Sequence, residues 1–257
     1  MQKFAMKISL AGGILAFGFG TALADQHEEP ATPIELFACS FVEDAGPADL
    51  DAWSAEWNKW ADKEKVDDYS AWTLAPYYAS NNQEFDFLWL GGSPSGQALG
   101  RVQDIWLATG ARMREELASV ANCNVHANYA VLQFKKPPER DDPSNVIISF
   151  SDCNMTDGMN FGADIGPALG AWSEYKNGHN STAGMWVLFP AYGGGGEEFD
   201  FKYVEAFNNL EEQGIDWDQY SKDGWQKAEE LFAGKLSCDS SRVYLATNRR
   251  MAENDDD

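Results

Sequence analysis

An internal repeat is the feature that most constrains the fold of this 257-residue chain. The tetrapeptide Glu-Phe-Asp-Phe occurs at 84–87 and again at 198–201, a shift of 114 residues. Such self-similarity predicts two structural copies related by a pseudo-two-fold axis, so a binding site is expected within one copy or across that axis. The same shift superimposes further identical residues: Trp72 on Trp186, Pro76 on Pro190, Tyr78 on Tyr192, Gly110 on Gly224, and Glu115-Glu116-Leu117 on Glu229-Glu230-Leu231.

The four cysteines follow the repeat, because each copy has one near its beginning and one near its end. Cys39 aligns with Cys153, and Cys123 aligns with Cys238 once one residue is inserted. Cysteines of an exported protein are expected to pair. The repeat selects Cys39 with Cys123 and Cys153 with Cys238 from the three possible connectivities. A four-cysteine zinc site is the alternative, but the chain lacks the closely spaced Cys-x-x-Cys pair that such sites use.

The N-terminus has the order of a secretory signal peptide. Lys3 and Lys7 precede an apolar run from Ile8 to Phe19, and Thr21-Ala22-Leu23-Ala24 then offers a small-residue cleavage site. An uncleaved membrane anchor is the alternative, although the run is short for a bilayer span. We therefore predict a signal peptide at 1–24, a periplasmic or secreted mature protein, and no membrane contact after cleavage.

The charge balance excludes two classes of partner. The formal net charge is −22, and removal of residues 1–24, which contain two lysines and no acidic residue, changes it to −24. Nucleic acids and anionic lipids bind clustered Lys and Arg, so such an acidic surface repels both. We predict a small-molecule ligand and no nucleic-acid partner, and the sequence leaves the oligomeric state open. Ten tryptophans and 44% hydrophobic residues provide enough apolar material for two cores.

The first copy is expected to have the order strand, helix, strand, strand, helix, strand. Its first helix follows Pro47 and has an apolar stripe at helical spacing. Ser95 is expected to cap the second helix rather than to act as a nucleophile. The strands are expected at 34–42, 71–78, 85–90 and 129–134; the helix stripes are Leu50, Trp53, Trp57 and Trp60, and Val102, Trp106, Met113 and Leu117.

The second copy repeats this order. Gly193 to Gly196 is interpreted as a hairpin loop, because it joins two expected strands and lacks the helix and the Lys-Ser/Thr of a phosphate-binding loop. The prolines and charges between the copies indicate a linker. We expect strands at 147–150, 185–190, 199–204 and 243–246, helices at 168–175 and 217–231, a first repeat at 34–136, a linker at 137–146, a second repeat at 147–250 and an acidic tail at 251–257.

This element order is the split unit of ferredoxin-like folds, an antiparallel four-stranded sheet with both helices on one face. Its first strand lies beside its fourth, which agrees with the predicted disulfides. By element order, duplication and aromatic strands, the chain resembles the dimeric α+β barrel superfamily. The resemblance implies an α+β fold in which tandem duplicated ferredoxin-like (βαββαβ) units form an intramolecular dimeric α+β barrel. The chain is similar to chlorite dismutase-like haem proteins, which keep both units in one polypeptide, and to small cofactor-free monooxygenases.

The repeated strands also supply the candidate binding residues. Side chains alternate along a strand, so Asp86 and Asp200 point away from the neighbouring phenylalanines, and a carboxylate there requires a partner. One hypothesis makes both aspartates the polar groups of a ligand pocket. The alternative is that each bonds a nearby backbone group or tyrosine hydroxyl and fixes its hairpin, as is typical of a feature present in both copies. The candidate pocket residues are Trp72, Tyr78, Asp86, Trp186, Tyr192 and Asp200.

Metal ligands are scarce. His126 and His179 are the histidines outside the N-terminal tail, and neither is repeated. We predict no metal site and no fixed cofactor, because a haem would require a buried axial histidine whereas His179 lies in a turn-like stretch. The predicted function is to bind or convert a small apolar or aromatic molecule in a barrel cavity between sheet and helices. A haem-dependent oxidoreductase of the tandem-barrel type and a non-catalytic structural or interaction module are the alternatives, and turnover itself is not predicted.

Overall fold

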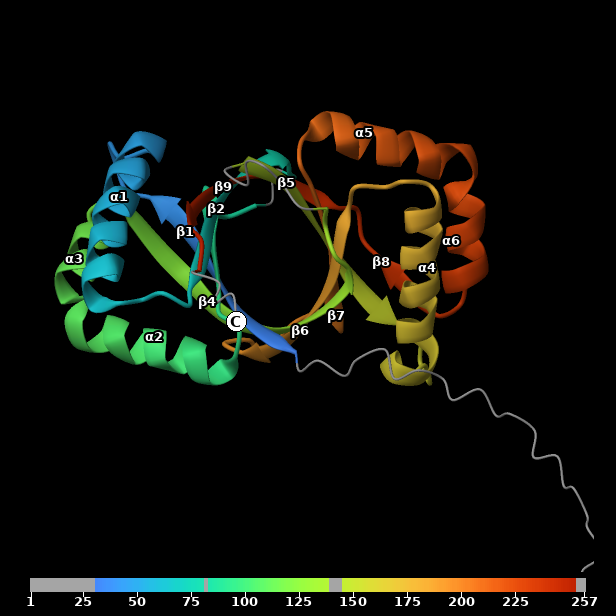
Figure 1. Cartoon of the computed structure of the whole chain (residues 1–257), viewed down its shortest axis with the longest axis horizontal. Helices are drawn as coiled ribbons and strands as arrows, with labels where there is room; N and C mark the ends of the chain where they lie inside the picture. Colours follow the sequence, from blue (N-terminus) through green and yellow to red (C-terminus); the bar gives the residue numbers. More distant parts are fainter. Residues whose placement is uncertain (1–30, 81–82, 139–144, 253–257) are drawn as a thin grey trace, which may run out of the picture. The chain divides into compact units, whose positions relative to one another are not determined.

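The computed structural model describes residues 31–80, 83–138 and 145–252 (Figure 1). The predicted signal peptide at 1–24 lies outside these residues, as do most of the predicted linker and of the acidic tail. Within the described ranges, no helix combines the length and the apolar character needed to cross a membrane. Residues 31–138 are called the first half below, and residues 145–252 the second half.

The first half follows the expected order, with one helix divided in two. Its elements are β1 (Thr32–Phe41), α1 (Pro47–Glu64), β2 (Ser70–Tyr78), β3 (Phe87–Gly92), α2 (Gly96–Thr109), α3 (Ala111–Ala118) and β4 (Ala121–Lys135). The Asp49 carboxylate accepts a hydrogen bond from the Gly46 backbone at the start of α1, and Lys65 ends that helix in the left-handed conformation. Ser95 caps α2 by accepting from the Ala98 N–H, which confirms its predicted structural role.

The second half has the same framework with more irregular helices. Its elements are β5 (Asn145–Met155), the π-helical turn η1 (Phe161–Ile165), α4 (Gly166–Gly178), β6 (Gly184–Tyr192), β7 (Phe201–Phe207), α5 (Leu210–Gln219), the π-helical turn η2 (Tyr220–Gly224), α6 (Trp225–Phe232), β8 (Leu236–Cys238) and β9 (Arg242–Arg250). The glycine run joins β6 to β7, and Gly193 has a φ of 85°, so the interpretation as a hairpin loop is confirmed.

The strands close into an eight-stranded antiparallel barrel in the order β4-β1-β3-β2-β9-β5-β7-β6, with β6 returning to β4. Both halves have the same internal order, because β9-β5-β7-β6 corresponds to β4-β1-β3-β2. Two pairings join the halves, β2 with β9 and β4 with β6. β8 and β9 pair one after the other with the same side of β5. The single strand β4 of the first half therefore corresponds to two strands, β8 and β9, in the second half.

Helices cover the outside of the barrel on opposite sides, α1 to α3 over the first half and α4 to α6 over the second (Figure 1). The barrel interior contains one apolar cluster with members from both halves, including Leu36, Leu74, Tyr129, Phe150 and Tyr244. A second cluster packs the tryptophan stripe of α1 against β3 through Trp53, Trp57, Phe87 and Trp89. A third cluster joins α4 to the second-half sheet through Leu169, Val187 and Phe201.

Both predicted disulfides are confirmed. Cys39 is bonded to Cys123 and Cys153 to Cys238, and in each pair the two cysteines are directly opposite on adjacent antiparallel strands. All four cysteines are therefore in disulfides. The strand pairing places each bridge within one half, so each half is cross-linked independently.

The helices depart from the expected ones where glycines fall. The single second helix of the first half is divided at Gly110, where a Cβ atom would lie 2.4 Å from the Trp106 ring. The corresponding Gly224 ends η2, between α5 and α6, so one expected helix at 217–231 becomes three segments. A close ring contact favours glycine at the first break, because any larger residue would displace the indole.

Candidate functional site

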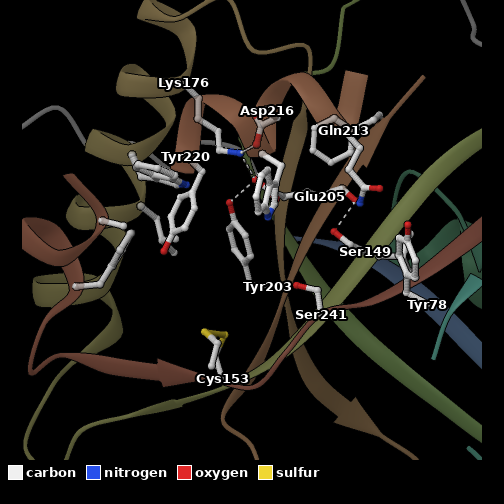
Figure 2. Close-up of a pocket in the computed structure, with 18 of the residues that line it drawn as sticks. Tyr78, Ser149, Cys153, Lys176, Tyr203, Glu205, Gln213, Asp216, Tyr220 and Ser241 are labelled. Carbon is white, nitrogen blue, oxygen red and sulfur yellow. Dashed lines mark hydrogen bonds and ion pairs between the residues drawn. A yellow bond between two sulfur atoms is a disulfide. The ribbon is translucent and has the colours of Figure 1, made fainter. Parts of the chain in front are cut away.

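A cavity of about 760 Å³ lies between the outer surface of the second-half sheet and its helices (Figure 2). It is called the second-half cavity here. β5, β7 and β9 form its floor, while α4, α5, η2 and α6 form its walls and roof. It therefore lies outside the barrel, whose interior contains the shared apolar cluster. The rings that line the cavity are those of Tyr78, Trp172, Phe201, Tyr203, Phe207, Trp217, Tyr220 and Phe232.

The corresponding space in the first half is filled by side chains. Trp53 and Trp57 of α1 pack edge-on against Trp89 of β3. The Tyr69 hydroxyl reaches over Gly91, where a Cβ atom would lie only 1.7 Å from it. The repeat shift of 114 aligns Trp89 with Tyr203 and Gly91 with Glu205. The second half thus replaces a large ring by a smaller one and a glycine by a carboxylate, whereas α5 and α6 contribute no buried residue.

A buried ion-pair cluster forms the polar part of the second-half cavity (Figure 2). The Lys176 Nζ atom of α4 lies 2.5 Å from Glu205 Oε1 of β7 and 2.7 Å from Asp216 Oδ2 of α5. The Tyr203 hydroxyl donates to Glu205 Oε1 at 2.8 Å, and the Ser181 hydroxyl donates to Asp216 Oδ1 at 2.5 Å. The Lys176 side chain is only 6% exposed, so its charge depends on these two carboxylates.

The electrostatics keep this lysine protonated. Burial alone would lower the pKa of Lys176, but the charges and hydrogen bonds of Glu205 and Asp216 outweigh it, and the pKa is raised above its usual value. Burial, with the Glu205 charge as the second cause, raises the pKa of the Tyr203 hydroxyl well above 10. At neutral pH the cluster therefore contains an ammonium and a neutral phenol.

The two predicted aspartates tie strands together and do not line the second-half cavity. Asp86 Oδ2 accepts from the Phe41 N–H at 2.8 Å, and the Asp86 N–H donates to the Cys39 carbonyl. Asp200 Oδ2 accepts from the Met155 N–H at 2.7 Å, and its N–H donates to the Cys153 carbonyl. Phe41 and Met155 are related by the same 114-residue shift as the two aspartates. Each carboxylate therefore makes the same backbone contact in its own half.

The structure separates the four predicted aromatic residues. Trp72 and Trp186 are half-buried and pack against the apolar cluster inside the barrel. Tyr78 and Tyr192 lie at the ends of β2 and β6, where they are 60% and 79% exposed. Of the six candidates, Tyr78 is the one that lines the second-half cavity, and it reaches there from the first half.

The histidines lie apart from this cavity. His179 Nδ1 is 2.8 Å from the Tyr175 carbonyl, and His179 borders a small pocket on the other side of Trp172 and Lys176. His126 Nε2 is 2.8 Å from Glu35 Oε2 on the outer face of the first half, and its ring stacks on Phe37. In the described part of the chain, no group of three or more His, Cys, Asp or Glu residues could hold a metal ion.

Sequence reasoning missed the ion-pair cluster, although one signal for it was present. Leu169, Trp172 and Lys176 have helical spacing, which puts a lysine in line with the buried face of α4. Phe201, Tyr203 and Glu205 likewise share one face of β7. A charge in an apolar stripe indicates a buried partner, but neither pattern says which residues meet across the fold.

These features define a protein with the fold of the dimeric α+β barrel proteins and a cavity with a buried ion-pair cluster in its second half. No family model and no curated protein matches the sequence. Among solved structures, a haem-binding protein from Thermus thermophilus has a TM-score of 0.51 at 10% identity, covering 86% of this chain and 93% of that one. A chlorite dismutase from Candidatus Nitrospira defluvii has a TM-score of 0.51 at 8% identity, covering 85% and 92%.

A third solved structure, assigned as a monooxygenase from Fusobacterium nucleatum, has a TM-score of 0.54 at 8% identity and covers 88% of this chain and 95% of that one. At such low identity the likeness establishes the fold alone. The activity of this chain must therefore be argued from its own residues.

Proposed function

We propose that the protein binds a small apolar or aromatic molecule in the second-half cavity. The asymmetry between the halves carries the proposal: the first half fills this space with tryptophans, whereas the second leaves about 760 Å³ lined by aromatic rings around a few polar groups. Cavities of this size and composition are typical of small-molecule sites. The buried ion pairs would fix the orientation of the ligand, and whether it is converted is left to experiment.

One structural neighbour is a haem-binding protein, but the residues of the second-half cavity do not fit an axial ligand to haem iron. No histidine or free thiol is among the lining residues, since both lining cysteines form a disulfide. Lys176 is an ammonium without a free lone pair, and the Tyr203 phenol is held neutral. Haem iron is typically held by a neutral imidazole, a thiolate, a methionine thioether or a phenolate, and the lining residues include no methionine either. We therefore propose binding that does not depend on iron coordination.

A matched pair of glycines provides the test. Gly214 of α5 lines the second-half cavity, and the repeat shift aligns it with Gly100 of α2. Neither glycine has an atom within 4 Å of the position that a Cβ would take, so both accept a side chain. We expect 2-naphthylmethanol, an uncharged aromatic probe, to bind the wild type and Gly100→Phe in calorimetry and to bind Gly214→Phe weakly or not at all.

Equal binding by all three proteins would place the probe elsewhere and contradict the proposal. No binding by any of them would favour the structural or interaction module. A Soret band that appears after mixing with haemin and is retained in His179→Ala would favour haem as the ligand, bound without that histidine.

We also propose that the protein is exported and that its halves descend from a duplicated ferredoxin-like unit. Two disulfides support an oxidising compartment, and the shared strand order with the paired contacts of Asp86 and Asp200 supports duplication. Intact-mass analysis should find a mature chain that starts at Asp25; an uncleaved chain in the cytosol would contradict export. An experimental structure whose halves failed to superimpose strand for strand would contradict the duplication.

A further inference from the structure

The charged residues that line the second-half cavity are one lysine and two acids: Lys176, Glu205 and Asp216. With all three ionised, the cluster has a net charge of −1 in a cavity whose other lining residues are apolar or uncharged. The Glu205 and Asp216 side chains are 17% and 15% exposed, so solvent screens this charge only in part. Lys135, which is not among the lining residues, also interacts with these charges, but its ammonium donates to the Ser181 and Ala183 carbonyls. Among the side chains that line the cavity, carboxylates therefore outnumber ammonium groups.

One carboxylate oxygen is left for a ligand. Both oxygens of Asp216 are engaged, Oδ2 by Lys176 and Oδ1 by the Ser181 hydroxyl. Glu205 Oε1 receives both Lys176 and the Tyr203 hydroxyl. Glu205 Oε2 has no hydrogen-bond partner among the described residues, and it is not among their buried, unsatisfied atoms. This oxygen is thus an accessible acceptor beside the aromatic walls.

The aromatic walls of the second-half cavity also favour a positively charged ligand. The faces of tryptophan and tyrosine rings attract cations, and the Lys176 ammonium already lies 5.5 Å from the centre of the Trp172 ring. Trp217 and Tyr220 add further rings beside the cavity. An anionic ligand would instead face two carboxylates, and the lysine that could attract it is held by both of them.

We infer that the ligand of the second-half cavity is an apolar or aromatic molecule that carries a protonated amine, with the ammonium on Glu205 Oε2. This inference rests on the proposed function and narrows it to a class of ligand. Lys176 then has a structural role as well: it holds Glu205 Oε1, so that Oε2 is directed to the ligand.

Three probes with one ring system test the charge preference. Calorimetry at pH 7 would compare 2-naphthylmethylamine, which is a cation, with the uncharged 2-naphthylmethanol and with the anion 2-naphthoate. We expect the amine to bind at least about tenfold more tightly than the alcohol, since one added charge contact worth about 1.4 kcal/mol gives that ratio. The naphthoate should bind most weakly.

Two variants assign the preference to Glu205. Glu205→Gln should bind the amine and the alcohol about equally, so that the tenfold preference is lost. Tyr203→Phe removes a hydrogen bond to Glu205 but leaves the Glu205 carboxylate in place. This variant should therefore still prefer the amine over the alcohol, and it controls for local structural disturbance. Far-ultraviolet circular dichroism would confirm that both variants are folded.

The outcomes separate the two proposals. If the alcohol binds but the amine binds no better, or the naphthoate binds best, the inference about charge is wrong and the proposed cavity function stands. A preference for the amine that persists in Glu205→Gln would also overturn the inference. If none of the three probes binds, both the proposed function and the inference about the charge of the ligand are wrong.

Discussion

Replacing Lys176 by methionine keeps an unbranched side chain that is one atom shorter and removes the charge, which should strongly destabilise the protein. The lysine side chain is 6% exposed and neutralises two carboxylates at 2.5 and 2.7 Å. Without it, Glu205 and Asp216 remain as two negative charges in a poorly solvated site. The other polar contacts of these carboxylates come from neutral hydroxyl groups.

Removing one partner of a buried ion pair typically costs about 3–5 kcal/mol, because the remaining charge is left uncompensated. Both carboxylates retain some solvent contact, at 17% and 15% exposure, so we expect a loss of about 3 kcal/mol near neutral pH. In the wild type the raised pKa of Lys176 means that its contribution is present below the ordinary lysine value of 10.5 and is lost as pH rises beyond it.

Urea unfolding at pH 7 would measure this loss, with Lys202→Met as the matched control. Lys202 is 16% exposed and lies 2.5 Å from Asp152, but Asp152 keeps Arg242 at 3.2 Å as a second cation. Its loss should therefore be nearer to about 1 kcal/mol. If Lys176→Met were no more destabilising than Lys202→Met, the reasoning would be refuted.

Three further predictions concern the scaffold. Replacing both cysteines of either disulfide by serine should lower the free energy of unfolding by about 4–5 kcal/mol, since the closed loops span 84 and 85 residues; a clear difference between the two bridges in urea unfolding would contradict this. Asp86→Ala and Asp200→Ala should each lower the free energy of unfolding by about 1–2 kcal/mol and leave the affinity for 2-naphthylmethanol unchanged. Weakened binding of this probe without loss of stability would instead indicate that the two aspartates contact the ligand. Burial would raise the pKa of Glu35, but hydrogen bonds from His126, Tyr69 and Gln103 outweigh it and lower that pKa, so the contribution of Glu35 to the free energy of unfolding is present above pH 4.5 and is lost as pH falls through the lowered pKa. Glu35→Gln should reduce this loss of stability in acid, and an unchanged dependence of the unfolding free energy on pH between pH 5 and 3 would disprove the prediction.

The repeat made much of the fold predictable. A single shift placed the aromatic strands and the first cysteine of each copy in equivalent positions, and one inserted residue did the same for the second cysteine. Pairing of the cysteines within each copy required the first and last strands to be neighbours. The structure has that neighbour relation in β1 with β4 and in β5 with β8. These features depend on periodicity and on local spacing, which a single sequence records directly.

A cavity between sheet and helices was predicted, but the half that contains it and the residues that line it could not be predicted in the same way. The repeat emphasises what the halves share, and so it favoured Asp86 and Asp200, whereas the cavity arises from a difference between the halves at Gly91 and Glu205. Lys176 and Asp216 are 40 residues apart, and only the packing of α5 on the second-half sheet brings them together. The sequence pattern predicted one helix at 217–231, whereas the structure has three helical segments there, with a π-helical turn that ends at Gly224.

The closure of the barrel by β2 with β9 and by β4 with β6 limits how the gene can be divided. A polypeptide that contained either half alone would have two long strands with unsatisfied backbone donors and acceptors along their outer edges, and such edges recruit another chain. A single half should therefore assemble with a second copy through those edges, or precipitate, and the cavity-bearing half cannot be studied as an isolated monomer.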